Sequence, residues 1–276
     1  MTGSEALARG ARLLREAGVP DAAGDARRLL AHALGAEPGR LTLVLPEEVP
    51  RNLSEDYDAL LARRARREPV SHLVGVRGFW GREFLVTPDV LDPRPETEVL
   101  VAAALEGPFG RVLDLGTGSG CLLVTLLAER PQATGQGLDL SHGALEVARA
   151  NAGRHGVAAR ASFAASDWFA AAEGRFDLIV SNPPYIAAGE MPGLEPEVRD
   201  WEPRMALTDE GDGLGAYRAI LAGARTHMAP GARLMLEHGP GQSDAIAAIG
   251  RSHGFPAPQV RRDLDGRARA IMFRGP

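Results

Sequence analysis

From residue 111 onward, the sequence alternates between short apolar segments and longer segments with helical spacing. This alternation predicts a parallel sheet, because a helix must carry the chain back before the next parallel strand begins. We expect strands at 111–115, 134–140, 160–165, 176–181 and 232–238, and helices near 120–130, 141–155, 212–228 and 241–253. The tail, at 258–264 and 268–273, predicts a hairpin around Asp265-Gly266. The predicted fold class is therefore α/β, a mostly parallel doubly wound sheet with a C-terminal antiparallel hairpin.

The first 75 residues lack this alternation and are rich in Ala, Leu and Arg with helical spacing. Asp21 is expected to cap the second helix and Ser54 to begin a later one, which ends in an arginine cluster between Arg63 and Arg67. We interpret that cluster as a solvated helix end. The resulting domain prediction is an N-terminal helical bundle at 1–75, a β-hairpin linker at 76–92 and an α/β domain at 93–276.

Composition limits the classes of partner and compartment. The chain of 276 residues has one cysteine, Cys121, and we find neither a signal peptide nor an apolar run long enough to cross a bilayer. The first 80 residues hold 12 Arg against 11 acidic residues, and the remainder holds 19 against 25. Neither part has the excess of basic residues typical of a protein that grips nucleic acid directly. We therefore expect a cytoplasmic monomer that binds neither nucleic acid directly nor membrane.

Three glycines follow the first strand of the α/β domain at alternate positions, Gly116, Gly118 and Gly120. Glycines at such a turn let a ligand approach the backbone closely. A dinucleotide fold would need its third glycine at position 121, which is Cys121. The spacing therefore favours S-adenosylmethionine over a dinucleotide and disfavours a dehydrogenase.

Polar residues follow the next two predicted strands as well. Asp139 ends the second strand, where a carboxylate in nucleotide-binding folds accepts the ribose hydroxyls. Asp167 and Trp168 follow the third strand, where the adenine is expected. Taken singly, each residue has an alternative interpretation, Asp139 as a helix cap and Trp168 as a packing residue. Because all of them lie at successive strand ends, we interpret them together as a cofactor site without a metal.

The fourth strand runs into Asn182, Pro183, Pro184 and Tyr185. The prolines fix φ and remove backbone donors, and a residue before proline is pushed out of helical conformation. The Asn182 side-chain oxygen and the Pro183 carbonyl could then both accept hydrogen bonds from one planar –NH2 group, on which Tyr185 could stack. The segment thus predicts a clamp for an amide or exocyclic amine, and the alternative reading is a proline-rich turn.

Several motifs together resemble the release-factor glutamine methyltransferases, within the Rossmann-like class I methyltransferases that use S-adenosylmethionine. Those motifs are PVSHL (69–73), GFW (78–80), PRPETE (93–98), VLDLGTGSGC (112–121), SDWF (166–169), SNPPYI (181–186), WEP (201–203), DGL (212–214) and LEHG (236–239). The family methylates the side-chain amide nitrogen, N5, of the glutamine in the GGQ motif of class I peptide chain release factors, and leaves S-adenosyl-L-homocysteine. Asp92 departs from the pattern, because an apolar residue is expected there.

The resemblance also implies roles for individual residues. In the family, the glycine loop lines the methionine and ribose part of the cofactor, the acid after the second strand holds the ribose, and the Asp-Trp pair lies by the adenine. The matching positions here are Gly116, Thr117, Gly118, Ser119 and Gly120, then Asp139, then Asp167 and Trp168. Asn182 would touch both cofactor and substrate, and Asn182 to Tyr185 would bind the glutamine. The helical domain would dock the release factor, and the roles of Glu96 and Glu98 stay open.

Two other functions remain possible from the sequence. The first is a methyltransferase acting on amino groups of adenine or guanine in nucleic acid, which shares the Asn-Pro-Pro-Tyr motif. The second is a cofactor-binding protein without catalysis, whose helical part docks a partner. The balance of charge weighs against the first, and the intact Asn182 and Tyr185 weigh against the second.

Overall fold

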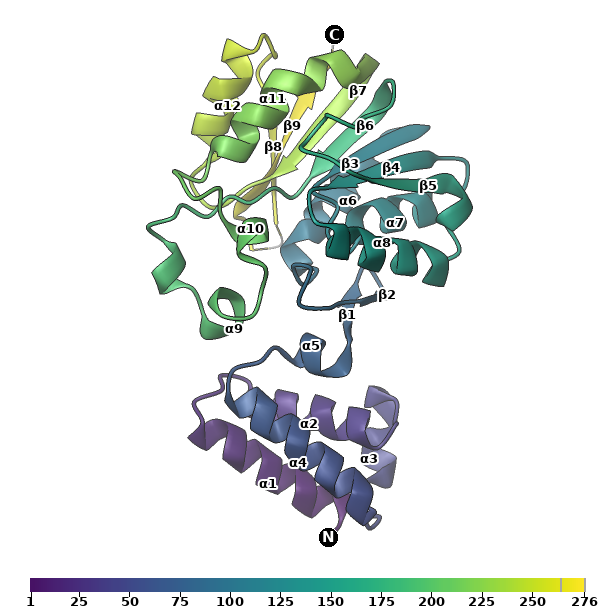
Figure 1. Ribbon diagram of the computed structural model, residues 1–276, viewed down its shortest axis with the longest axis vertical. Helices are drawn as coiled ribbons and strands as arrows, with labels where there is room; N and C mark the ends of the chain where they lie inside the picture. Colours follow the sequence, from purple (N-terminus) through teal and green to yellow (C-terminus); the bar gives the residue numbers. More distant parts are fainter. Residues whose placement is uncertain (264, 276) are drawn as a thin grey trace. The chain divides into compact units, whose positions relative to one another are not determined.

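The computed structural model describes residues 1–263 and 265–275 of the chain (Figure 1). These residues form two compact units, one of residues 1–76 with 195–201 and the other of residues 77–194 with 202–276. Leu264, which falls in the strand expected at 258–264, lies outside the described residues. Among the described helices, none is both long and apolar enough to span a bilayer.

The smaller unit is helical. Its elements are α1 (Gly3–Glu16), α2 (Ala22–Ala33), the 3-10 turn η1 (Pro38–Arg40), α3 (Leu41–Val44), α4 (Arg51–Ala65), α5 (Val70–Val74) and α9 (Pro196–Arg199). The Asp21 side chain caps α2 by accepting from the Gly24 amide, as expected. Helix α4 begins at Arg51 and not at Ser54, because Pro50 takes an extended conformation and starts the helix without a side-chain cap.

Only part of the arginine cluster at the end of α4 is the solvated helix end that we expected, because Arg63 and Arg66 are exposed whereas Arg64 and Arg67 are not. Arg64 is only 5% exposed and pairs with Asp25 and with Glu197, both at 2.7 Å. Arg67 also bonds Glu197, at 2.6 Å. Arg64 and Arg67 both bind Glu197 of α9, which lies about 130 residues later in the sequence. These two arginines therefore stabilise the tertiary structure of the unit.

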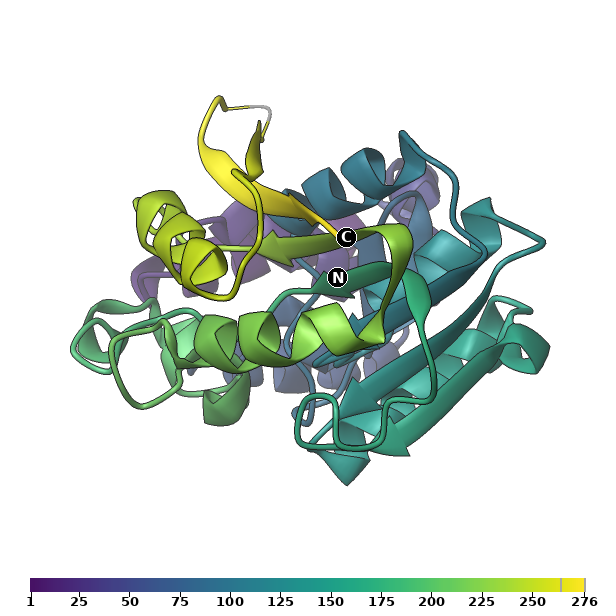
Figure 2. The ribbon, with the colours of Figure 1, turned by 90° about the horizontal axis from the view of Figure 1, so that it is seen from above.

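The larger unit contains a seven-stranded sheet in the order β5-β4-β3-β6-β7-β9-β8, in which β9 and β8 are antiparallel (Figures 1 and 2). Its strands are β3 (Arg111–Leu115), β4 (Thr134–Asp139), β5 (Ala161–Ala165), β6 (Phe176–Ser181), β7 (Met228–Glu237), β8 (Gln259–Arg262) and β9 (Ala268–Arg274). The predicted α/β class and C-terminal hairpin are confirmed. Strand β7 begins four residues before the predicted start, because a bulge opposite Phe176–Leu178 absorbs its Pro-Gly segment.

Helices cover both faces of this sheet. On one face lie α6 (Glu98–Leu105), α7 (Cys121–Glu129) and α8 (His142–Arg154), and on the other lie α11 (Gly215–His227) and α12 (Ser243–Ser252) (Figure 2). Neighbouring strand residues point to opposite faces, so Val180 and Met235 pack under α6 and α7 while Ile179 and Leu236 pack under α11.

Shorter elements complete the larger unit. A two-stranded hairpin, β1 (Val76–Phe79) and β2 (Arg82–Leu85), turns at Trp80-Gly81, where both residues have positive φ. The remaining turns are η2 (Pro95–Thr97), η3 (Ala158–Arg160), η4 (Met191–Gly193) and α10 (Arg204–Leu207).

Candidate active site

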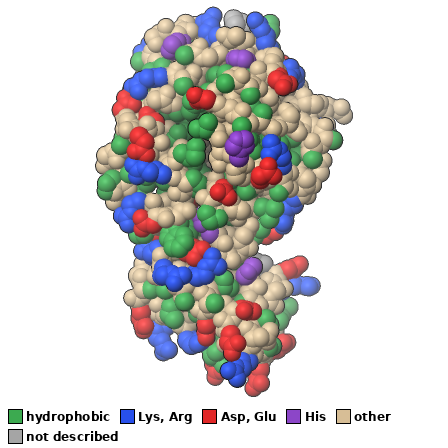
Figure 3. All heavy atoms as spheres, viewed as in Figure 1, with side chains coloured by type: hydrophobic (Ala, Val, Ile, Leu, Met, Phe, Trp, Pro, Cys, Tyr) green, Lys and Arg blue, Asp and Glu red, His purple; other side chains and the backbone are tan. Residues whose placement is uncertain are grey.

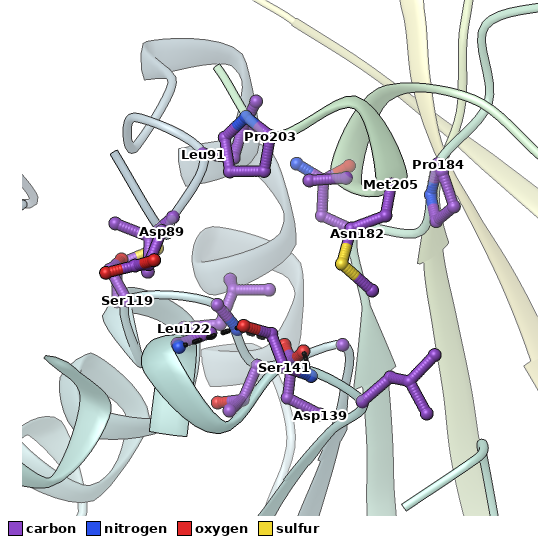
Figure 4. Close-up of a pocket in the computed structure, with 18 of the residues that line it drawn as sticks. Asp89, Leu91, Ser119, Leu122, Asp139, Ser141, Asn182, Pro184, Pro203 and Met205 are labelled. Atoms are coloured by element: carbon purple, nitrogen blue, oxygen red, sulfur yellow. Dashed lines mark hydrogen bonds between the residues drawn. The ribbon is translucent and has the colours of Figure 1, made fainter. Parts of the chain in front are cut away.

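A cavity opens at the carboxyl ends of β3 to β6, where open parallel sheets bind their ligands (Figure 4). Nine of the predicted site residues line it: Gly116, Thr117, Gly118, Ser119, Asp139, Asp167, Trp168, Asn182 and Pro184. The other three, Gly120, Pro183 and Tyr185, are not among its lining residues. Gly120 is the N-cap of α7, Pro183 is buried and Tyr185 packs partly into the core under α11.

The glycine loop forms the floor of the cavity beside β3. Gly116 and Gly118 have φ of +67° and +54°, and a Cβ added to either would meet no atom within 4 Å. Both glycines are therefore needed for their backbone conformation and leave the cavity free for a ligand. Below them the Thr117 hydroxyl donates to Asp114 at 2.7 Å, and burial raises the pKa of Asp114 to about 7.

Asp139 holds the loop from the end of the neighbouring strand, β4. One of its oxygens accepts from the Gly118 amide at 2.8 Å and the other from the Ser141 amide at 2.9 Å. A carboxylate has about four acceptor positions, so each oxygen keeps capacity for a ligand hydroxyl. Figure 4 shows Asp139 and Ser141 together along one edge of the cavity, across from Asn182.

A tight turn after β5 fixes Trp168 at the cavity. Trp168 has a φ of +48°, which is rare for a residue of this size. The Ser166 hydroxyl donates to the Trp168 carbonyl at 2.8 Å and accepts from the Ala171 amide at 3.0 Å. The two bonds hold the turn, while Asp167 stays exposed at the rim.

The Asn-Pro-Pro-Tyr segment is held at both ends. At its start, the Ser181 hydroxyl donates to the Leu115 carbonyl at 2.6 Å, and Asn182 Nδ2 donates to Thr97 Oγ1 at 3.2 Å. At its end, Gln242 Nε2 donates to the Tyr185 carbonyl at 2.9 Å, and Gln242 Oε1 accepts from the Gly239 amide at 2.9 Å. Burial raises the pKa of Tyr185 to about 12, so its phenol is neutral.

Two segments that the spacing of the residues did not place at the site also line the cavity. Arg94 and Thr97 come from the stretch before α6, and Pro203 and Met205 come from the region of α10. Arg94 donates to the buried Glu202 at 2.6 Å, which ties the two segments together. Burial nevertheless raises the pKa of Glu202 to about 7, although Arg94 opposes the shift. The signal that could have found them is the motifs PRPETE and WEP, which carry the family resemblance.

The structure also places the residues that the sequence left uncertain. Glu96 and Glu98 are not among the cavity's lining residues, and Glu98 accepts from the Trp80 amide at 2.7 Å, in the turn of the β1–β2 hairpin. Asp92, found where an apolar residue was expected, is 3% exposed and lies at the cavity wall.

Comparison with solved structures defines the class of fold. The chain superposes on the crystal structure of a methyltransferase from Pyrococcus furiosus with a TM-score of 0.57 and 18% identity, covering 78% of this chain and 99% of that one. The fold is thus that of the Rossmann-like methyltransferases.

Sequence comparison gives the family. Residues 5–75 match the PrmC N-terminal domain, and residues 90–193 match the methyltransferase small domain. The release factor glutamine methyltransferase of Cereibacter sphaeroides is 55% identical over 276 residues, covering 100% of this chain and 99% of its own. The protein of that name from Rhodospirillum rubrum is 45% identical over 271 residues, covering 97% and 83%. The chain belongs to the family of release factor glutamine methyltransferases, which confirms the resemblance.

Proposed function

We propose that this protein transfers a methyl group from S-adenosylmethionine to the side-chain amide nitrogen, N5, of the glutamine in the GGQ motif of class I release factors. The observation that carries the proposal is the row of functional groups along adjacent strand ends. From β5 to β6 the row reads Asp167 and Trp168, Asp139, the glycine loop and Asn182. An extended cofactor laid along that row brings its far end to Asn182.

The residues of the row fit the parts of S-adenosylmethionine in order. Trp168 offers an aromatic surface for the adenine, and Asp139 offers free acceptor positions for the ribose hydroxyls. Gly116 and Gly118 leave open space where any other residue would place a Cβ, which suits the methionine part. The reactive end would then lie between the glycine loop and Asn182, in the cavity that both of them line.

Asn182 and Pro183 supply orientation for the substrate. An amide nitrogen is a poor nucleophile, because its lone pair is delocalised into the carbonyl. Bound S-adenosylmethionine supplies a methyl group on a positively charged sulfur, which is a good leaving group. The Asn182 oxygen and the Pro183 carbonyl accept from the glutamine –NH2, hold it in line and stabilise the positive charge that develops on nitrogen. The proton of the product passes to water, and no side chain of the site is required as a general base.

The three segments predicted from the sequence take different roles in this proposal. Residues 1–75 form the release-factor-docking domain, 76–92 the hairpin linker and 93–276 the catalytic domain. On the face drawn in Figure 3, acidic and basic side chains are interspersed. The mixture of charges on this face is compatible with a protein substrate.

Mass spectrometry of the GGQ peptide tests the proposal directly. Purified protein and S-adenosylmethionine are incubated with a release factor, and the glutamine peptide is expected to gain one methyl group. Parallel reactions with tritiated methyl donor on ribosomal RNA and duplex DNA are expected to stay at background. Transfer to nucleic acid without transfer to the release factor would refute the assignment.

Asn182→Ala is the matched variant for the clamp. We expect a loss of more than ~100-fold in turnover with cofactor affinity nearly unchanged, which is the scale of losing one oriented polar contact in a transition state. A turnover near that of the unmodified protein would refute the clamp.

A further inference from the structure

Behind Asn182 lies a buried polar chain that reaches away from the cavity. Asn182 Nδ2 donates to Thr97 Oγ1 at 3.2 Å, a bond that leaves the Thr97 proton unused. The Thr97 hydroxyl also lies close enough to the buried Glu237 carboxylate to lower its pKa, and Glu237 Oε2 makes no hydrogen bond to the described residues. Thr97 is 2% exposed and Glu237 is 1% exposed. Thr97 lines the cavity, while Glu237 is not among its lining residues.

The topology of the sheet brings these three residues together. Strands β6 and β7 are parallel neighbours, with Ser181 opposite Leu236, so Asn182 and Glu237 are the next residues of the two strands. Each stands two positions beyond a residue that packs under α6, Val180 and Met235 respectively. Because side chains alternate along a strand, Asn182 and Glu237 both face α6, and Thr97 directly precedes that helix.

A hydroxyl group has a single proton to donate, so the bond that this proton makes decides which groups are donors and which are acceptors in the buried polar chain. When the Thr97 proton goes to the Glu237 carboxylate, Thr97 Oγ1 is left only as an acceptor. Its partner on Asn182 must then be the –NH2 group and not the oxygen. The Asn182 oxygen is thereby turned away from Thr97 and stays free to accept a hydrogen bond.

We propose that Glu237 and Thr97 are positioning residues that fix which end of the Asn182 amide faces the substrate. The inference rests on the proposed function, in which the Asn182 oxygen accepts from the glutamine –NH2. Without the carboxylate, Thr97 could donate to the Asn182 oxygen. The amide would then rotate and present its own –NH2 to the –NH2 of the substrate, two donors that cannot bond each other.

The ionisation state of Glu237 decides at which pH the hydrogen bonds of Asn182, Thr97 and Glu237 take this donor–acceptor order. Burial raises the pKa of Glu237 to about 7, and the negative charge of Glu96 acts in the same sense. The Thr97 hydroxyl and the positive charges of Arg269 and Arg94 oppose the shift. At pH 8 Glu237 is predominantly ionised and only accepts, so the assays are set at that pH.

Glu237→Met separates positioning from folding. Methionine keeps the length of the side chain and removes a buried carboxylate, a change that is often neutral or stabilising in protein interiors. We therefore expect an unchanged or higher Tm, an unchanged cofactor Kd by calorimetry, and a kcat at least ~10-fold lower on the release factor. A merely structural role for Glu237 predicts no such separation of Tm and kcat. A folded Glu237→Met protein with the original kcat would overturn the inference.

Thr97→Val and Thr97→Ser form the second pair of variants. Valine has nearly the shape of threonine without the hydroxyl, whereas serine keeps the hydroxyl. We expect a loss of ~10-fold to ~100-fold in kcat for valine and a kcat within ~3-fold of the original for serine, both with the original cofactor Kd. Equal losses in the two variants, or no loss in valine, would overturn the inference.

One further measurement keeps this inference distinguishable from the proposed function. In nuclear magnetic resonance spectra of the unmodified protein, the Asn182 side-chain –NH2 signals are expected to shift in Thr97→Val and to return in Thr97→Ser. This readout needs no turnover. Absence of glutamine methylation by the unmodified protein would refute the proposed function, whereas unchanged Asn182 signals in Thr97→Val would refute the positioning chain alone.

Discussion

Asp139 offers the sharpest test of the cofactor site, because its contacts define what its removal can cost. In the structure its two oxygens accept from the Gly118 amide and the Ser141 amide, at 2.8 and 2.9 Å. In the proposed complex, the same carboxylate also accepts from the ribose hydroxyls. Asp139→Ala therefore removes the ribose contact together with one support of the glycine loop.

The magnitude follows from the number and kind of these bonds. A hydrogen bond to a charged group contributes about 1.5–3 kcal/mol, and Asp139 is only partly buried, so water replaces part of what is lost. Taking one such contact as the net loss, the cofactor Kd is expected to rise ~10-fold to ~150-fold. The kcat at saturating cofactor is expected to stay within ~3-fold, because Asp139 ends β4 whereas Asn182 follows β6, with β3 between them.

Isothermal titration calorimetry with S-adenosyl-L-homocysteine measures this Kd, and Asp177→Ala is the matched control. Asp177 also accepts from two backbone amides, those of Gly110 and Arg111, both at 2.8 Å, but at the opposite end of the sheet. The control is expected to lower Tm by a similar amount and to leave Kd unchanged. An unchanged Kd in Asp139→Ala, or equal changes in both variants, would show that the carboxylate does not hold the cofactor.

Three other outcomes follow from the buried polar groups. Arg64→Met removes the cation that Asp25 and Glu197 share, although each acid keeps a second arginine, Arg28 and Arg67 respectively. The substitution should lower the free energy of unfolding in urea by about 1.5–3 kcal/mol, and a loss no larger than that of exposed Arg66→Met would contradict the pairing. Gln242→Leu removes three neutral hydrogen bonds behind Tyr185 and should lower kcat/KM for the release factor by ~10-fold at unchanged cofactor Kd, whereas a changed Kd with normal kcat/KM would contradict it. Burial raises the pKa of three carboxyls to about 7, so the folded chain holds protons that the unfolded chain releases above about pH 4.5. Those carboxyls are Asp114, Glu202 and Glu237. The stability that these three groups contribute is fully present below about pH 4.5 and is lost as the pH rises through 7. The buried His238, whose pKa is lowered, has the opposite effect. Tm should therefore be higher at pH 5.5 than at pH 8, and the reverse order would refute the shifts.

The parts of the fold that were predictable depend on local patterns. Strand β3 was predicted with the bounds that it has, because an apolar run followed by glycines marks both its length and its end. The buried pairing of Arg64 was missed because its partners are distant in sequence, and Glu197 lies 133 positions away. The spacing of the residues predicts that Arg64 lies at the end of a helix, but it does not reveal that α9 packs against this arginine.

In the site, too, residues in local sequence patterns were predictable, whereas contacts between distant segments were not. One of those distant contacts can nevertheless be derived from a local property of the strands. The glycine loop and Asp139 were found because each lies at the end of a strand. Thr97 and Glu237 were given no role, because the motifs that contain them, PRPETE and LEHG, do not reveal a contact with Asn182. Yet the parity of a strand is local: Val180 and Met235 pack under one layer of helices, and the residues two places later must face that same layer. Once the β6–β7 register is known, the convergence of Asn182 and Glu237 follows without any side-chain coordinates. Sequence alone therefore lacks the register of β6 against β7 and the placement of α6. With these two facts, the buried Glu237 is placed next to Asn182, where we propose that it positions the substrate clamp.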